Sequence, residues 1–307
     1  MSTLSVIVCT HNRLDDLGEC LKALAREAAD HEVIVVDSAP AQPAQDLVAS
    51  YERRIPNLRY IRVQQPGLSL ARNHGIEASH GEIVAFLDDD AAPCPGWAAA
   101  MLSAFGRHAA AGGVGGACLP RFDGQRPPWL SDRLLQLASI TRWGESERQP
   151  RSSAEWPFGA NMAFRREVLH RVGPFSTELG RTGSASLLSG EDSEMVARVL
   201  AAGWEIWLAP AAAVEHRVHA ERLRSRFYWR RFWWGGVSRA QTPTPALSAR
   251  VLVAAPLRLL AWLLTRDRIF LYRQAEAAGY FMTLARRLRS SRDRRTPRRA
   301  EPRRAPD

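Results

Sequence analysis

Residues 82–93 read EIVAFLDDDAAP and combine an apolar run with a cluster of carboxylates. The apolar run has the composition of a β-strand that is buried on both faces. Three aspartates, Asp88, Asp89 and Asp90, follow it directly, and Pro93 prevents a regular continuation of the strand. Because adjacent like charges are too costly to bury inside a sheet, we expect the aspartates at its carboxyl edge. Open α/β sheets bind their ligands at that edge.

Two interpretations of the three aspartates are open at this point. Carboxylate oxygens are hard ligands that suit Mg²⁺ or Mn²⁺, and Mg²⁺ is commonly held by one or two carboxylates together with substrate phosphates. The alternative is a solvated acidic turn that caps the next helix, which we expect to begin near Gly96 and Trp97. Other parts of the chain must decide between a metal site and a cap.

Apolar runs of strand length alternate with segments of helical periodicity over the first part of the chain. The expected strands are residues 4–9, 32–36, 58–63, 83–87 and 112–118. The expected helices are residues 14–24, 68–78 and 97–105, with a short helix before residue 58. This alternation predicts an α/β fold with a mostly parallel central sheet and helices on both faces.

Residues 119–155 lose this periodicity and carry several prolines, so we expect a long excursion near the site that serves as a lid. Residues 156–164 return to the composition of a strand. A helix is expected after Gly190, followed by two short strands at residues 205–208 and 212–215.

The chain of 307 residues is long enough for one domain of about 200–250 residues plus an appendage. Its cysteines form no Cys-x-x-Cys pair, which argues against a zinc knuckle or a disulfide framework and favours a reducing compartment. They are Cys9, Cys20, Cys94 and Cys118. No secretory signal is expected, because strand-like residues already begin at Leu4.

The net charge of +10 is unevenly distributed along the chain. Residues 1–219 contain 21 Lys and Arg against 26 Asp and Glu, whereas residues 220–307 contain 21 Arg against 6 acids. The basic character therefore belongs to the C-terminal part. Such polarity predicts an acidic globule joined to a segment that meets an anionic surface.

Several motifs occur together in a recognisable order. They are VIVCTHNR (6–13), VVD (35–37), GLSLARNHG (67–75), FLDDD (86–90) and GED (190–192), with FGANMAF (158–164) and a late histidine, His216. With these motifs at these spacings, residues 3–218 resemble family 2 glycosyltransferases of the GT-A fold, and the remainder is more loosely similar to bacterial polysaccharide-biosynthesis members. The resemblance implies a Rossmann-like nucleotide-sugar domain over residues 1–219.

The resemblance also assigns a donor site. It implies that Asp88 and Asp90 are the ends of the family's D-x-D motif and that His216 completes the metal site with them. Of the two aspartates, we favour Asp90 as the direct ligand. The residues implied to contact the nucleotide are Thr10, Asn12, Arg13, Asp37, Arg72, Asn73, Asp88 and Asp89. Without the family, a lone histidine such as His216 is more often structural. From Asp37 the chain reads Asp-Ser-Ala-Pro, where many relatives carry Asp-Asp-Gly-Ser. The second acidic residue is absent, so the sequence specifies the base of the nucleotide poorly.

The acidic pair Glu191 and Asp192 opens a helix, where favourable interaction with the helix dipole alone would account for it. By resemblance to inverting relatives, Asp192 is the base that takes the acceptor proton, with Glu191 as its substitute or an acceptor contact. The residues expected to shape the sugar and acceptor pocket are Trp156, Gly159, Ala160 and Asn161. For Trp156, packing in the core is an equal alternative.

Residues 222–234 interleave arginines with aromatic residues, which suits either nucleic acid or the headgroup region of a bilayer. The apolar stretch 247–264 contains Arg250, Pro256 and Arg258, which argues against a spanning helix and favours an interfacial one. We therefore expect a basic, aromatic, helical extension over residues 220–289 and a disordered tail over residues 290–307. The alternative is that these helices pack on the catalytic domain or on a second subunit.

Together these observations predict an inverting, metal-dependent glycosyltransferase of the hexosyltransferase type. It would use Mn²⁺ or Mg²⁺ and a nucleoside-diphosphate sugar, with a UDP-sugar expected. The acceptor would be a hydroxyl of a glycan or a lipid-linked sugar in cell-surface polysaccharide synthesis, at the inner face of the cell membrane. A nucleic-acid partner is not expected. The rivals are a non-catalytic nucleotide-sugar scaffold, a nucleic-acid-binding protein and, more weakly, a nucleotidyltransferase.

Overall fold

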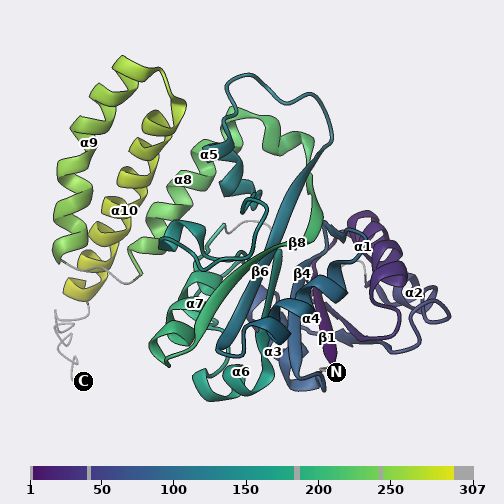
Figure 1. Cartoon of the computed structure of the whole chain (residues 1–307). Coiled ribbons are helices and arrows are strands. Elements are labelled where there is room, and N and C mark those ends of the chain that lie inside the picture. The colour runs from purple at the N-terminus through teal and green to yellow at the C-terminus, as the bar shows by residue number, and fades with distance from the viewer. Residues whose placement is uncertain (1–2, 40–42, 183–186, 242–244, 294–307) are drawn as a thin grey trace, which may run out of the picture. The chain divides into compact units, whose positions relative to one another are not determined.

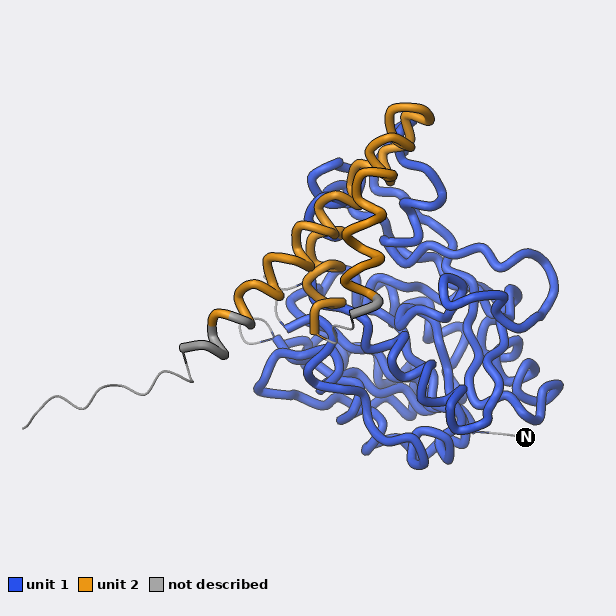
Figure 2. Tube along the Cα trace, turned by 90° about the vertical axis from the view of Figure 1, so that its left-hand side faces the viewer, with its two compact units in different colours: residues 1–231 blue, residues 232–307 orange. Residues whose placement is uncertain are grey.

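The computed structural model describes residues 3–39, 43–182, 187–241 and 245–293. The chain divides into two compact units, residues 1–231 and 232–307 (Figure 2). The functional boundaries expected after residues 219 and 289 stay predictions. Residues 294–307 of the expected tail lie outside the described residues.

The first unit is built on a central sheet, in which Figure 1 labels β1, β4, β6 and β8. The sheet has eight strands in the order β3-β2-β1-β4-β7-β6-β8-β5. The strands are β1 Leu4–Thr10, β2 Glu32–Asp37, β3 Leu58–Arg62, β4 Ile83–Asp88, β5 Ala91–Pro93, β6 Ala111–Phe122, β7 Asn161–Arg165 and β8 Glu205–Val218. Strands β3, β2, β1 and β4 are parallel, and so are β6 and β8. β7 runs antiparallel to both of its neighbours, and β5 runs antiparallel to β8.

Helices cover both faces of this sheet, as the sequence predicts. The helices before residue 224 are α1 Leu14–Glu27, α2 Gln45–Ala49, α3 Leu68–Ala78, α4 Trp97–Arg107, α5 Asp132–Leu135, α6 Arg166–Val172 and α7 Glu191–Ala201, with the 3₁₀ turns η1 Gln136–Ala138, η2 Ser153–Glu155 and η3 Ala220–Leu223. Of these, α5, α6 and the 3₁₀ turns were not predicted from the sequence. One apolar cluster joins the sheet to α1, α2 and α4, and a second joins it to α3, α6 and α7. Successive side chains of a strand point to opposite faces, so Val6 and Val8 of β1 enter the first cluster and Ile7 the second.

Four features of the sheet differ from the sequence prediction. β7 covers residues 161–165 instead of the expected 156–164, and β6 continues to Phe122, beyond the expected end at residue 118. Residues 205–208 and 212–215, expected as separate strands, belong to the single strand β8. Its pairing with β6 is irregular, because Gly116 pairs with Ala209 while Cys118 pairs with Val214, so the β8 residues between those two bulge from the ladder. The short strand β5, directly after the aspartates, was not predicted from the sequence, and it pairs with β8.

The second unit is helical, as expected for the C-terminal extension. It contains the end of α8 Ser225–Arg239, then α9 Pro245–Thr265 and α10 Arg268–Asp293. Val251 of α9 and Tyr280 of α10 share a small apolar core. Gly236 of α8 lies so close to α10 that a β-carbon there would be 2.0 Å from the carbonyl oxygen of Glu276. The glycine therefore allows the close approach of these two helices.

The outer surface of α9 is strongly apolar. Leu252 and Val253 are each 64% exposed, and Leu264 is 76% exposed. Within the described residues, Leu247–Thr265 is one segment long and apolar enough to cross a membrane by length and composition, with a mean hydropathy of 1.7. A large exposed apolar surface of this kind is typical of a segment that meets lipid or another protein.

Candidate active site

The candidate site lies at the carboxyl edge of the parallel strands. Thr10 at the end of β1 pairs with Asp37 at the end of β2, and Cys9 pairs with Asp88 at the end of β4. The register of the sheet therefore gathers polar side chains from separate motifs at one edge. This is the position predicted for ligand binding in an open α/β sheet.

Two of the three consecutive aspartates approach His216. Asp88, Asp90 and His216 each offer a ligand atom, and these atoms lie within 4.8 Å of one another. His216 reaches the aspartates because β5 and β8 pair in antiparallel fashion, which sets Ala91 opposite His216. The pairing of β5 with β8 thus brings together residues that are far apart in the sequence.

The two carboxylate oxygens of Asp90 have different surroundings. Oδ2 accepts hydrogen bonds from Arg13 Nη1 at 2.9 Å and from Arg222 Nη2 at 2.8 Å. Oδ1 lies 3.0 Å from His216 Nε2. Burial acts to raise the pKa of Asp90, but His216 and Arg222 outweigh it and hold the pKa well below its usual range. Asp90 is therefore a carboxylate that stays ionised although its side chain is only 1% exposed.

Three buried polar atoms in this group have no hydrogen-bond partner among the described residues. They are Oδ1 of Asp90 and both ring nitrogens of His216, since the close approach of these two side chains lacks hydrogen-bond alignment. Buried polar atoms are normally satisfied, so exceptions need an explanation. Carboxylate oxygens and an imidazole nitrogen that converge in this way fit a divalent cation such as Mn²⁺.

Asp89 points to β1. Its Oδ2 accepts a hydrogen bond from Thr10 Oγ1 at 2.8 Å, and its Oδ1 contacts Arg13 Nη1 at 3.2 Å. Burial raises the pKa of Asp89 to about 7, although Arg13 opposes this rise. Asp89 thereby ties the loop after β4 to the loop after β1, and its expected contact with the nucleotide stays a prediction.

Arg72 of α3 connects Asp88, a member of the candidate metal group, to the acidic pair of α7. Its Nη1 donates to Glu191 Oε1 at 3.1 Å, and its Nη2 lies 3.8 Å from Asp88 Oδ1. The guanidinium also lies over the ring of Phe175, 5.3 Å from its centre. A β-carbon on Gly159 would lie 1.8 Å from Arg72 Nη2. Gly159 is thus the residue that leaves room for this buried arginine.

Glu191 and Asp192 have distinct environments. Glu191 is buried, and burial followed by the nearby Asp192 raises its pKa, while Arg72 opposes the rise. Asp192 is only partly buried, and its carboxylate accepts hydrogen bonds from the backbone N–H groups of Gly159 at 3.3 Å and Ser193 at 2.7 Å. Of the two acids, Asp192 is therefore the one that is both accessible and held in place.

Asp37 and Asn73, both expected at the nucleotide, have partners within the protein. Asp37 is fully buried and accepts hydrogen bonds from Tyr60 Oη at 2.8 Å and from two backbone N–H groups of the segment after β2. Asn73 makes a paired contact with the backbone of Phe175, donating to its oxygen at 2.9 Å and accepting from its nitrogen at 2.8 Å. These contacts fix both side chains within the protein, and their expected contact with the nucleotide stays a prediction.

The residues expected in the sugar and acceptor pocket are mostly internal. Asn161 is 1% exposed, accepts a hydrogen bond from Trp97 Nε1 at 3.0 Å and donates to two backbone carbonyls. Ala160 is also buried, and Trp156 is partly buried against an apolar cluster. By contrast, Asn12 is exposed and has a positive φ of 55° after β1.

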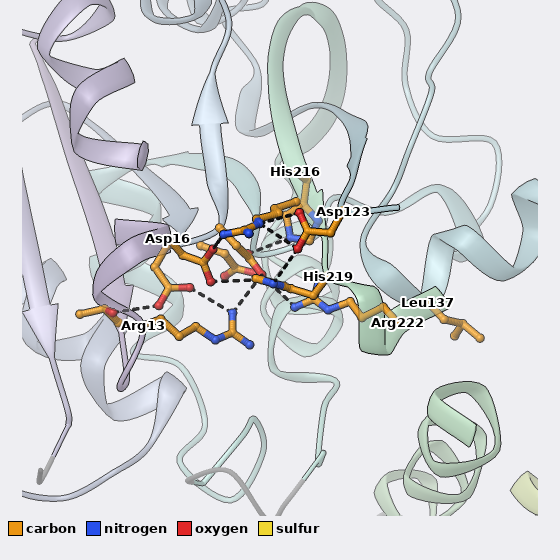
Figure 3. A network of polar contacts seen from close by, with 12 residues as sticks. Arg13, Asp16, Asp123, Leu137, His216, His219 and Arg222 are labelled. Atoms are coloured by element: carbon orange, nitrogen blue, oxygen red, sulfur yellow. Dashed lines mark hydrogen bonds and ion pairs between the residues drawn. The ribbon is translucent and has the colours of Figure 1, made fainter. Parts of the chain in front are cut away.

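Sequence reasoning missed a polar network beside Asp90 (Figure 3). Asp16 of α1 accepts from Arg217 Nη1 at 2.8 Å and lies 3.1 Å from His219 Nε2, and Asp123 accepts from Arg217 Nε at 2.8 Å. Arg222, which we expected to face lipid or nucleic acid, is instead buried on Asp90. The sequence does contain one indication of this network, because ionisable side chains stand three residues apart at His216, His219 and Arg222.

Comparison with known proteins identifies the family of the chain. The family model described as Glycosyl transferase family 2 matches residues 5–173, which is more than half of the chain. The chain belongs to glycosyl transferase family 2. As a member of this family the protein is a glycosyltransferase, and the family resemblance inferred from its motifs is confirmed.

The names of two relatives of this glycosyltransferase refer to glycoconjugate and polysaccharide synthesis. The chain is 24% identical over 240 residues to glucosyl-dolichyl phosphate glucuronosyltransferase of Haloferax volcanii, covering 76% of this chain and 75% of the relative. It is 27% identical over 225 residues to the succinoglycan biosynthesis protein ExoM of Rhizobium meliloti, covering 71% and 68%.

A solved structure of similar fold is the mannosyltransferase PcManGT from Pyrobaculum calidifontis in complex with GDP-Man and Mn²⁺. The TM-score is 0.58 at 22% sequence identity, covering 95% of this chain and 80% of that chain. The comparison supports the GT-A fold predicted for this glycosyltransferase from its sequence.

Proposed function

We propose that this glycosyltransferase transfers a hexose from a nucleoside-diphosphate sugar, expected to be a UDP-sugar, to a hydroxyl of a glycan or lipid-linked acceptor, with inversion and with a divalent metal ion. The observation that carries the proposal is the convergence of Asp88, Asp90 and His216, in which Oδ1 of Asp90 and both ring nitrogens of His216 are buried without a hydrogen bond. The names of the relatives support a role in glycoconjugate synthesis.

In the proposed mechanism, Asp88, Asp90 and His216 would hold Mn²⁺ or Mg²⁺, and the ion would supply positive charge against the departing diphosphate. The partly exposed Asp192 takes the proton from the acceptor hydroxyl. The acceptor oxygen forms a bond to the anomeric carbon as the bond from that carbon to the diphosphate breaks, which inverts the configuration. The backbone N–H groups that bind Asp192 keep its carboxylate oriented for this task.

Glu191 is less suited to be the base. Its carboxylate is buried and bonded to Arg72, so a hydroxyl would have to displace an internal ion pair to reach it. We assign Glu191 the role of fixing Arg72 beside Asp88. A positively charged guanidinium at that place is well suited to the phosphates of a nucleotide.

Replacement of Asp90 by asparagine tests the proposal with the least disturbance of shape. We expect calorimetry to show that wild-type protein binds one nucleoside diphosphate among UDP, GDP, CDP and ADP more tightly with Mn²⁺ than without it. In Asp90→Asn the gain from Mn²⁺ should fall by about tenfold or more, since a charged ligand is lost. Asp30→Asn, at an exposed aspartate, is the control and should behave as wild type. Equal Mn²⁺ dependence in Asp90→Asn would refute the metal site.

We propose in addition that the second unit attaches the enzyme peripherally to the inner face of the cell membrane. The exposed leucines of α9 provide apolar contact, and the arginines of α9 and α10, including Arg250 and Arg268, can meet anionic headgroups. The same surface supports an acceptor that is itself lipid-linked.

Vesicle flotation tests this attachment. We expect the protein to float with vesicles of phosphatidylglycerol and phosphatidylcholine, and the double variant Leu257→Glu/Leu260→Glu to lose most of this binding, because each charge is costly at the acyl boundary. Leu200→Glu changes an exposed leucine of the first unit and serves as the matched control. Undiminished flotation of the double variant would contradict the proposal. Steeply salt-dependent binding to an oligonucleotide instead would favour the nucleic-acid alternative.

A further inference from the structure

Arg222 contacts Asp90, a proposed metal ligand, and the mechanism proposed above gives Arg222 no role. Its Nη2 lies 2.8 Å from Asp90 Oδ2, and the two side chains are 5% and 1% exposed. Arg13 also contacts Asp90, but its side chain is 32% exposed and it is shared with Asp89. Of the two arginines that contact Asp90, Arg222 is therefore the enclosed one.

The arginines already neutralise the aspartates. Arg13 and Arg222 contact Asp90, Arg13 contacts Asp89, and Arg72 lies 3.8 Å from Asp88. A divalent ion binds a carboxylate through the charge of its oxygens, and a guanidinium on the same carboxylate repels that ion. Arg222 and a free metal ion are consequently competitors for the charge of Asp90.

The position of Arg222 allows it to change partner. It lies in η3, a short 3₁₀ turn directly after β8, and its backbone is held by a hydrogen bond to His219 O at 2.8 Å. Guanidinium groups bind phosphate as well as carboxylate, often with two parallel hydrogen bonds. A diphosphate bound beside Asp90 would give Arg222 an alternative acceptor of higher charge.

We propose that Arg222 is a positioning residue that acts as a stand-in cation for Asp90. It lowers the affinity of the free enzyme for a metal ion alone and is drawn to the diphosphate when metal and nucleotide bind together. Metal and nucleotide therefore strengthen the binding of each other, by the same factor in both directions. This inference rests on the proposed function, because it requires the site to bind both ligands.

Titration of the full-length protein with MnCl₂ alone, followed by electron paramagnetic resonance of the free ion, tests the inference. In Arg222→Gln, which removes the charge but keeps a donor amide, we expect the affinity for Mn²⁺ without nucleotide to rise about tenfold. The factor by which UDP or another diphosphate improves Mn²⁺ binding should shrink accordingly. Arg222→Lys keeps the charge and should retain the weak binding of free Mn²⁺.

Arg226→Gln is the matched control, because it removes the same charge from an exposed arginine of α8. It should leave Mn²⁺ binding unchanged. A substitution that merely damages the fold would weaken Mn²⁺ binding, so tighter binding is a result that a structural role of Arg222 does not produce. If Arg222→Gln binds free Mn²⁺ no more tightly than wild type, the inference is wrong. If no nucleoside diphosphate improves Mn²⁺ binding even in wild type, the proposed function fails and the inference falls with it.

Discussion

Replacement of Asp192 by asparagine is expected to lower the rate of sugar transfer by about 10²–10⁴-fold, the usual contribution of a positioned general base. Asparagine can still accept hydrogen bonds from the backbone of Gly159 and Ser193, so the local structure should persist. Mn²⁺-dependent nucleotide binding should stay close to wild type, because Asp192 is not one of the residues that converge on the proposed metal position. The loss should thus appear in the chemical step.

The measurement is the release of nucleoside diphosphate from the donor that the binding experiments identify, with a membrane extract as the source of acceptor. Glu194→Gln is the control on the same helix. Glu194 forms an ion pair with Arg198, and Arg198 also donates to the backbone after α6, so this part of α7 makes structural contacts. It should transfer at nearly the wild-type rate. Wild-type turnover in Asp192→Asn would place the base elsewhere and would make Glu191 the first residue to test.

Replacement of Gly159 by alanine should lower both the stability of the protein and its affinity for nucleotide, although it adds only one methyl group. The added carbon would lie 1.8 Å from Arg72 Nη2, far inside van der Waals contact. Arg72 is 2% exposed and bound to Glu191 at 3.1 Å, so it cannot move away without separating a buried ion pair. Overpacking and loss of that pair together should lower the free energy of unfolding by about 3 kcal/mol.

Denaturant unfolding of Gly159→Ala and nucleotide binding in the presence of Mn²⁺ measure the two consequences. We expect nucleotide affinity to fall together with stability, because Arg72 leaves the side of Asp88. Gly106→Ala in α4 is the control, since nothing lies within 4 Å of its added carbon and alanine favours a helix. It should be neutral or slightly stabilising. An unaffected Gly159→Ala protein would show that Arg72 does not occupy this place.

Much of the fold could be predicted because its determinants are local. The alternation of apolar runs and helical periodicity specified the first four strands of the sheet and the helices α1, α3 and α4 to within a few residues, but not α6. The division of β8 into two expected strands had a physical basis, since the residues around Pro210 do leave the ladder with β6. The chain nevertheless continues as one strand, because its second half pairs again with β6 and also with β5. That pairing is a long-range contact that no local pattern reveals.

The candidate site could be predicted only where a residue belongs to a motif. Asp88, Asp90 and His216 were expected together, and the structure brings them together. Arg222 was assigned to a basic surface, because a charged residue in an Arg-rich run is usually solvated. Its burial follows from the ladder between β5 and β8, which ends beside η3. The interior hydrogen bonds of Asn73 and Asn161 could not be predicted either, because the sequence does not show which group an amide side chain will bind.

The pairing of β5 with β8 also sets the order in which the protein can become active. During synthesis the aspartates emerge early, whereas His216 and Arg222 follow only after most of the first unit has been made. Contacts between such distant parts of a chain form late in folding, because a long loop must close first. A nascent or truncated chain that ends before β8 therefore carries the acidic motif without its histidine and arginine partners. Loss of the final strand of the first unit should silence the enzyme even where the earlier strands have folded.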